Sequence, residues 1–266
     1  MLVKTAKFRP VTLESRLQFL QSNLLKMTAS TRPTVHLRPL GFDYKSVAAA
    51  AETLSLSFSS DPLICWLYRD PSGPRWDSLL PALQKWQQFR VRSYILDGIT
   101  IEAVTDDKSP RSVGVCVLHP PQSQYRWLRP WWWSSYLTFY WDLFWNRPDE
   151  PLADKKRTEI MLEQHNATFE KIQGQYPPNS LYYLEIAAVK PDTQGMGVGG
   201  KLMSWVVNQV GNSPCFLECT NPTNVAFYER YGFKLIEEGK LQDAANPALE
   251  TSFHYMVREK MGDSSE

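Results

Sequence analysis

The segment 181–211 restricts the fold more than any other part of the chain, because it reads as a strand, a glycine turn and a helix in direct succession. Leu181–Val189 is a strand candidate, and Gly197–Val210 has the pattern of a helix that Gly211 ends. Glycine occupies four of the six positions 195–200 that join them. The N–H groups at the start of a helix lack internal partners, so this turn presents unblocked donors to an anion.

The glycines of this turn have two possible explanations, a backbone conformation that requires glycine and the binding of an anion. A tight turn with positive φ would account for one or two of the glycines. Four glycines exceed that need, and no acid lies between Gln194 and Val210 to oppose an anion. The pattern therefore predicts a phosphate-binding turn.

A dinucleotide fingerprint is the first alternative for the phosphate ligand. Gly195-x-Gly197-x-x-Gly200 matches it, and Glu218 lies near the expected acidic position. In that fold, however, the first glycine follows its strand almost at once, whereas residues 190–194 intervene here. Too few residues also follow for the remaining parallel strands, so the sequence disfavours this reading.

The composition excludes several classes of protein. The 266 residues contain 43% hydrophobic and 21% charged residues, which is typical of one globular core, and Lys plus Arg (29) balance Asp plus Glu (28). No strong field therefore indicates nucleic acid. Four cysteines and four histidines are scattered without metal-ligand spacing, so no metal is expected. No apolar run approaches the roughly 20 residues that span a bilayer.

The order of predicted elements gives an α/β (mixed α+β) class: one mixed sheet with helices on both faces. We expect residues 1–33 to be an N-terminal extension and residues 34–260 a single domain, with a Trp-rich helical insert at 120–180. The expected strands are 35–38, 100–104, 113–118, 181–189, 215–219, 233–238 and 253–259, and the expected helices are 42–58, 61–68, 76–96, 155–173, 197–210 and 222–231.

The N-terminal extension leaves the location open. Its six basic residues face a single acid, Glu14, and it is rich in Ser and Thr, as a mitochondrial presequence would be. The other reading is a loosely ordered or docked helix over Val11–Met27, which fits a cytoplasmic protein.

The stretch Tyr125–Trp145 holds six of the ten tryptophans. It would form the wall of an apolar acceptor pocket, a buried extra helix, or a surface that touches a membrane, and the first two are compatible. In the pocket reading, Trp131, Tyr136 and Tyr140 bind the acceptor, which is then a bulky, partly apolar amine. We do not expect a membrane protein.

Two motifs carry a resemblance to a known family. Gln194–Gly199, after Val189-Lys190-Pro191-Asp192, resembles motif A of the GCN5-related N-acetyltransferases (GNAT). Asn221-x-x-Asn224-x-x-Phe227-Tyr228-x-x-x-Gly232-Phe233 resembles the family's motif B. The resemblance covers most of the chain except the N-terminus and the insert, and it implies the acyl-CoA N-acyltransferase fold with a mostly antiparallel sheet.

The resemblance implies acetyl-CoA as co-substrate, with its pyrophosphate on the backbone amides of the glycine turn. The pantetheine arm would then run between two strands that splay apart, 181–189 and 215–219, along an open edge. The residues implied for the cofactor are Ala187, Ala188, Val189, Gln194, Gly195, Met196, Gly197, Val198, Gly199, Gly200, Asn224 and Phe227.

Acetyl transfer needs a base for the amine and an acid for the thiolate that leaves. Alternation along the strand places Tyr183, Glu185, Ala187 and Val189 on one face. The resemblance places a base there. The histone-modifying branch has its glutamate at the position of Tyr183, which departs from that pattern, so Glu185 is the expected base and Tyr183 is expected to contact the acceptor. Tyr228 is the expected acid. Ion pairing of Glu185 and core packing of Tyr228 are the alternative roles.

The sequence thus predicts direct acetyl transfer from acetyl-CoA to a small-molecule amine, by a monomer or homodimer. The first alternative keeps the fold and changes the acceptor to a protein lysine or N-terminus. The second is a non-catalytic module that binds acyl-CoA.

Overall fold

The computed structural model describes residues 34–68, 76–106, 109–121, 130–146, 153–243 and 245–259. The predicted extension 1–33 lies outside the described residues, as do parts of the insert. Contacts group Val35–Glu266 into one compact unit.

A seven-stranded sheet forms the centre of this unit, in the order β1-β2-β3-β4-β5-β7-β6. Every neighbouring pair is antiparallel except β4 and β5, which are parallel. The predicted mixed, mostly antiparallel sheet is therefore confirmed. The strands are β1 (Val35–Pro39), β2 (Ile99–Thr105), β3 (Ser112–His119), β4 (Tyr182–Val189), β5 (Cys215–Cys219), β6 (Lys234–Gln242) and β7 (Glu250–Arg258).

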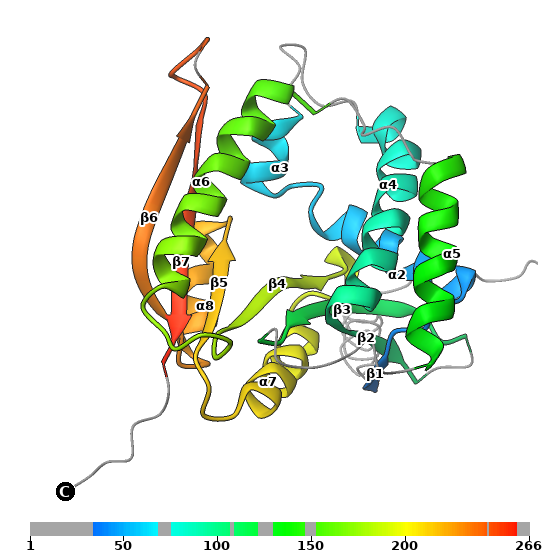
Figure 1. Ribbon diagram of the computed structural model, residues 1–266. Helices are drawn as coiled ribbons and strands as arrows, with labels where there is room; N and C mark the ends of the chain where they lie inside the picture. The colour runs from blue at the N-terminus through cyan, green and yellow to red at the C-terminus, as the bar shows by residue number, and fades with distance from the viewer. Residues whose placement is uncertain are drawn as a thin grey trace, which may run out of the picture. The chain divides into compact units, whose positions relative to one another are not determined.

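Helices cover both faces of the sheet, as the sequence predicts (Figure 1). Helix α7 packs on one face through Val198, Leu202 and Val206, which join the core of β1–β5. The opposite face carries two separate helix groups, α2 with α4 and α3 with α6. The helices are α2 (Tyr44–Ser57), α3 (Pro62–Leu67), α4 (Trp76–Asp97), α5 (Pro130–Asn146), α6 (Lys155–Gln173), α7 (Val198–Val210) and α8 (Val225–Glu229).

Two sequence interpretations change in the described elements. The single helix expected over 222–231 is a 3-10 turn, Pro222–Asn224, followed by the short helix α8. Asn221 caps this turn as expected, because its side chain accepts a hydrogen bond from the Thr223 backbone. Strands β6 and β7 extend further into a long hairpin than the sequence predicts, since residues 239–242 continue the pairing.

Candidate acetyl-transfer site

Strands β4 and β5 separate in the middle of the sheet. Their pairing joins Tyr182–Leu184 to Cys215–Leu217, and no later pair is recorded in these fully described strands. The predicted splay is therefore confirmed, and it leaves the β5-side edge of β4 without a strand partner from residue 185 onward. Glu185 and Glu218 are the first residues beyond the last pair.

A β-bulge at Glu185 changes which side chains share a face. Val117 pairs with Ile186, but Leu118 pairs with Leu184, so Glu185 is the extra residue. Strict alternation placed Tyr183, Glu185, Ala187 and Val189 on one face. That expectation is wrong: Ala187 and Val189 pack on the α7 side, whereas Tyr183 packs with the α3–α6 group on the other face. One inserted residue reverses the alternation at this point.

Glu185 is held by two partners that the sequence interpretation did not identify. Its Oε2 lies 2.6 Å from Nε2 of His119 on β3, and its Oε1 lies 3.5 Å from Nη2 of Arg90 on α4. Glu185 and His119 are each 24% exposed, so the pair is reachable from outside. The register of β3 on β4 brings His119 to Glu185, and the path of α4 brings Arg90 to it. A single sequence does not reveal the register or the helix path.

The surroundings of Glu185 set its charge. Burial favours the neutral acid, but the hydrogen bond with His119 and the positive charge of Arg90 outweigh it and lower the pKa of Glu185. Beside it, burial is the largest cause that raises the pKa of Tyr94. The Tyr94 hydroxyl forms no hydrogen bond of good geometry within the described part of the chain. Glu185 is therefore a carboxylate at neutral pH.

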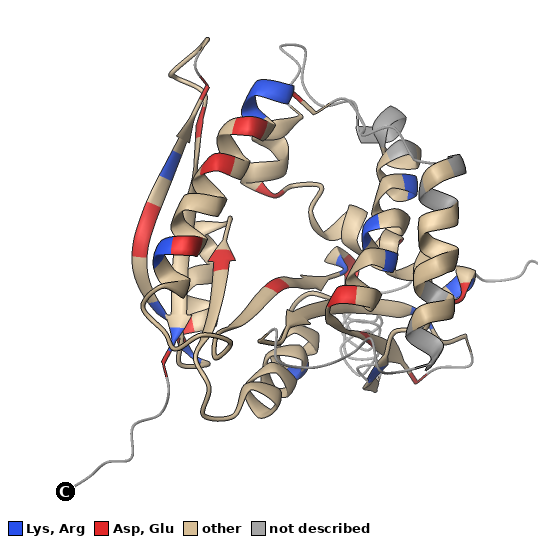
Figure 2. Ribbon diagram, in the orientation of Figure 1, with Lys and Arg blue, Asp and Glu red and all other residues tan. Residues whose placement is uncertain are grey.

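A second carboxylate–imidazole pair lies across the splay on the same face. Glu218 Oε2 is 2.8 Å from His165 Nδ1, and it also accepts a hydrogen bond from the Tyr183 hydroxyl at 3.1 Å. The Tyr183 ring stacks on His119 at 5.9 Å and contacts His165 at 6.0 Å between ring centroids. Tyr183, expected at the acceptor site, thus lies between the two pairs. Figure 2 shows acidic positions on both β4 and β5.

The glycine turn presents the uncapped helix start that the sequence predicts. Gly195 and Gly197 have φ of 76° and 86°, values that L side chains rarely adopt. Gly197 is the N-cap of α7 and provides no side-chain cap, and the fully described first turn of α7 holds no acid. Residues 194–197 are exposed, whereas the Val198 side chain is buried in the core. The first amides of α7 therefore remain available to an anion.

The other two glycines have packing roles that the sequence interpretation did not consider. A β-carbon at Gly199 would lie 3.3 Å from the Phe227 ring, and one at Gly200 would lie 3.2 Å from the Tyr231 hydroxyl. These glycines let α8 approach α7 closely. All four glycines thus have structural reasons, so their number alone does not indicate an anion site.

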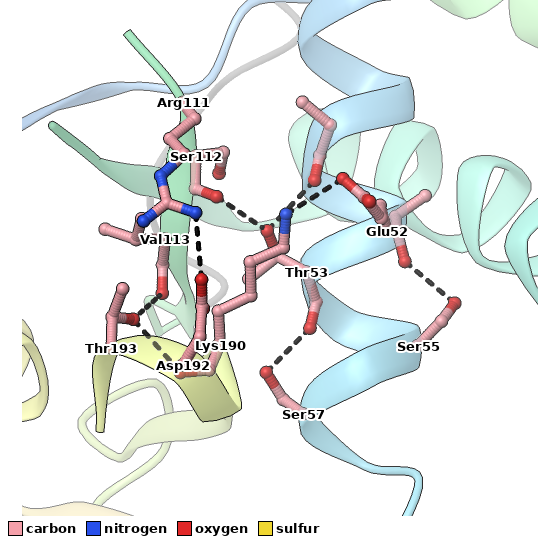
Figure 3. Close-up of polar contacts among 12 residues, drawn as sticks. Glu52, Thr53, Ser55, Ser57, Arg111, Ser112, Val113, Lys190, Asp192 and Thr193 are labelled. Carbon is pink, nitrogen blue, oxygen red and sulfur yellow. Dashed lines mark hydrogen bonds and ion pairs between the residues drawn. The ribbon is translucent and has the colours of Figure 1, made fainter. Parts of the chain in front are cut away.

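The segment between β4 and the turn is fixed by contacts with β3 and α2 (Figure 3). The backbone of Lys190 donates to the Val113 carbonyl at 2.8 Å, and its ammonium lies 2.9 Å from Glu52 on α2. The buried Thr193 hydroxyl donates to the Lys190 carbonyl at 3.0 Å. Arg111 pairs with Asp192 at 2.8 Å, but both side chains are half exposed and add little stability. The turn therefore starts from a fixed position.

Gln194 closes part of the open edge. Its side-chain amide donates to the Val189 carbonyl at 3.3 Å. The half-buried Ala187 side chain lies on the α7 face of the sheet, and the buried Ala188 side chain lies on the opposite face. Only alternate side chains along this edge therefore point toward α7. Met196 is 41% exposed beside the turn.

Tyr228 lies on the α7 face of the sheet. It packs against the core around α7, with its ring 5.3 Å from Phe227 and 6.2 Å from Phe233 between centroids. Burial, followed by Cys219 and Cys116, raises its pKa above the usual range, so the phenol keeps its proton. Asn224, at the start of α8, is exposed.

The aromatic insert forms helix α5, which packs on α4 through Phe139 and Phe89 at 4.9 Å between ring centroids. Tyr140 is 47% exposed and contacts Tyr136 at 4.3 Å between centroids. No contact recorded for the described residues joins either tyrosine to Glu185 or His119. The side chain of Trp131 lies outside the described residues. Their predicted acceptor role stays a prediction.

A shallow groove of about 610 Å³ runs along the exposed side of α7. It includes Gly197 at the glycine turn and continues past Lys201, Trp205 and Tyr231. Glu185, His119 and Tyr228 do not line it. Among the described residues, no helix is long and apolar enough to cross a membrane, and no cluster of three potential metal ligands occurs.

Comparison with known proteins agrees with this geometry. Residues 160–235, which contain the turn, the splay and α8, match the family model described as "Acetyltransferase (GNAT) domain". Three similar solved structures are a histone acetyltransferase HPA2 and related acetyltransferase of Corynebacterium glutamicum, arylalkylamine N-acetyltransferase 2 of Aedes aegypti, and a mosquito arylalkylamine N-acetyltransferase like 5b. Their identities are 18%, 14% and 15%, with TM-scores of 0.51, 0.53 and 0.50. The matches cover 87%, 85% and 84% of this chain and 98%, 99% and 99% of theirs.

The splayed strands β4 and β5 and the start of α7 all lie within the part of the chain that matches the acetyltransferase domain model. The similar solved structures confirm the predicted fold. The match over residues 160–235 agrees with the predicted GNAT family and with the predicted enzyme class.

Proposed function

We propose that this enzyme transfers an acetyl group directly from acetyl-CoA to the amine of a small, partly apolar molecule. The observation that carries the proposal is the splay after Leu184 and Leu217, because it opens the sheet between the glycine turn and the Glu185–His119 pair. A thioester in the opening would have donors for phosphate on one side and a proton-accepting pair on the other.

The residues of the turn fit a CoA ligand. The amides of Gln194–Gly199 would hold the pyrophosphate, since no side chain caps α7 and the turn is exposed. The unpaired edge at residues 187–189 would hydrogen-bond the amides of the pantetheine arm. Asn224 and Phe227 would border the arm on the α8 side.

The reacting groups would act from opposite faces. Proton removal from the amine would occur at the Glu185–His119 pair, and Tyr228 would protonate the thiolate that leaves. Burial raises the pKa of Tyr228, so the phenol would still carry its proton when the thiolate forms.

Aromatic rings surround the Glu185–His119 pair, and they suit a small acceptor. His119 and Tyr183 stack on one another, and Tyr94 lies at the edge of His119 at 6.3 Å between centroids. Such rings favour a partly apolar molecule over a charged polypeptide segment. Two of the similar folds belong to enzymes named for arylalkylamines, which is consistent with this class of acceptor.

A screen of amines with acetyl-CoA, in which free thiol release is measured, tests the proposal. We expect release with small aromatic or alkyl amines and little with lysine-containing peptides. Acetyl transfer to peptides alone would show that the acceptor is a protein amine and not a small molecule. Binding of acetyl-CoA without transfer to any amine would contradict the enzymatic proposal.

A further inference from the structure

We propose that His119, rather than Glu185, takes the proton from the acceptor nitrogen, and that Glu185 is a positioning residue that orients the imidazole. This inference rests on the proposed function, and it names the atom that acts as base: Nδ1 of His119.

The contact with Glu185 fixes the tautomer of His119. An ionised carboxylate only accepts hydrogen bonds, so the 2.6 Å contact between Glu185 Oε2 and His119 Nε2 requires the hydrogen on Nε2. The lone pair of a neutral imidazole then resides on Nδ1. Within the described part of the chain, no group hydrogen-bonds to this nitrogen. The pair therefore presents one free proton acceptor.

Both carboxylate oxygens of Glu185 face partners. Oε2 accepts from His119, and Oε1 faces the Arg90 guanidinium at 3.5 Å. These partners lower the pKa of Glu185, against the effect of burial, and so make the carboxylate a weaker base. An imidazole, with an ordinary pKa of about 6.5, accepts a proton from nitrogen more readily than a carboxyl with an ordinary pKa of about 4.3.

His119 is held in place by its neighbours. It pairs with Tyr183 across β3 and β4, one pair beyond the Leu118–Leu184 pair that adjoins the bulge, and it stacks on the Tyr183 ring. Gly98 leaves space for the imidazole, because a β-carbon there would lie 3.3 Å from Cε1. The ring is thus fixed between neighbours and still 24% exposed.

The charged and titratable groups around His119 come from several elements. Arg90 and Tyr94 face the pair from α4, and Glu185 and Tyr183 belong to β4. Beyond Tyr183 lie Glu218 on β5 and His165 on α6, which form their own pair. Glu185 contacts His119 directly, and Arg90 lies on the other oxygen of Glu185.

The proton balance is complete without another reactant. The neutral amine forms its bond to the acetyl carbon, and the carbon–sulfur bond of the thioester breaks. One N–H proton passes to His119 Nδ1, and the thiolate takes a proton from Tyr228. His119 then releases its proton to solvent and Tyr228 regains one, so the products are the amide and the free thiol.

The test compares H119Q and E185Q in pH profiles of kcat/KM, with the amine concentration corrected for its free-base fraction. We expect H119Q to lose roughly a hundredfold in kcat and to lose the acidic limb of the profile. E185Q should keep the limb but move it to lower pH, since it removes the negative charge that favours imidazolium. Acetyl-CoA affinity, measured by calorimetry, should be unchanged in both.

H36Q is the matched control, because His36 also pairs with a carboxylate, Asp106 at 3.1 Å, but on the edge strand β1. It should leave the profile unchanged. If H119Q keeps the acidic limb and E185Q removes it, Glu185 is the base and the inference is wrong. Nitrogen NMR of the wild-type imidazole gives a readout that needs no variant: hydrogen on Nδ1 instead of Nε2 at neutral pH would also overturn it.

The same experiments separate this inference from the proposed function. Absence of thiol release with every amine contradicts the function, whereas transfer that persists in H119Q with an unaltered profile contradicts only the role of His119.

Discussion

Gly114 on β3 lies against Val198, the first residue of α7: a β-carbon at Gly114 would come within 2.9 Å of Val198 Cγ1. Val198 is 2% exposed, so it has no space to move aside. The start of the helix that carries the glycine turn therefore rests directly on the sheet.

Gly114→Ala should destabilise the protein by about 1–3 kcal/mol, because the added methyl group overpacks this contact. Urea unfolding measures the loss. Gly174→Ala is the control: Gly174 has φ of −64° at the exposed end of α6, where alanine is tolerated. Equal effects of the two substitutions would show that the contact is not tight.

Gly197→Glu should abolish measurable acetyl-CoA binding in calorimetry, because it sets a carboxylate and a side chain at the helix start proposed for the pyrophosphate. Gly211→Glu controls for strain, since Gly211 also has a positive φ, 57°, but ends α7. Both variants should unfold at lower temperatures than the wild type. Retained affinity in a folded Gly197→Glu protein would refute the phosphate assignment.

Tyr228→Phe should lower kcat by roughly a hundredfold and leave acetyl-CoA affinity intact, because it removes the proposed proton donor but keeps the ring in the core. Steady-state kinetics and calorimetry separate the two effects. Tyr231→Phe, which removes a hydroxyl from the same surface beside Gly200, serves as control and should change turnover far less. A Tyr228→Phe enzyme of normal rate would make this tyrosine a packing residue only.

The His165–Glu218 pair should make stability depend on pH. The hydrogen bond that His165 donates to Glu218 raises the pKa of His165, although burial opposes it. The pair then stabilises the fold fully below the ordinary imidazole pKa of about 6.5, and this contribution is lost as pH rises through the raised value. The difference in unfolding free energy between wild type and His165→Gln should therefore be larger at acidic than at alkaline pH; a constant difference would contradict it.

The sequence predicts the strand–turn–helix unit well, because glycine placement, helix spacing and the two motifs all lie within a few residues of one another. It also predicts that Glu185 and Tyr183 belong to the site. It wrongly places Ala187 and Val189 on the same face as these two residues, because a bulge depends on the register of β3 against β4, and one strand alone does not reveal register.

His119 and Arg90 could not be found from the sequence for the same kind of reason. They are 66 and 95 positions away from Glu185, counted from the numbering, and only the pairing of β3 and the packing of α4 join them to it. The residues that flank His119 and Arg90 in the sequence form no motif that would mark either one as a site residue. Long-range contacts between polar side chains leave no local pattern.

The extra residue at position 185 has a kinetic consequence. Side chains before and after this residue point to opposite faces of the sheet, so the proposed donor and acceptor would approach β4 from different directions and would not compete for one entrance. Both would then be present at once, and double-reciprocal plots at several fixed donor concentrations should intersect; parallel lines would instead require that one reactant depart before the other arrives.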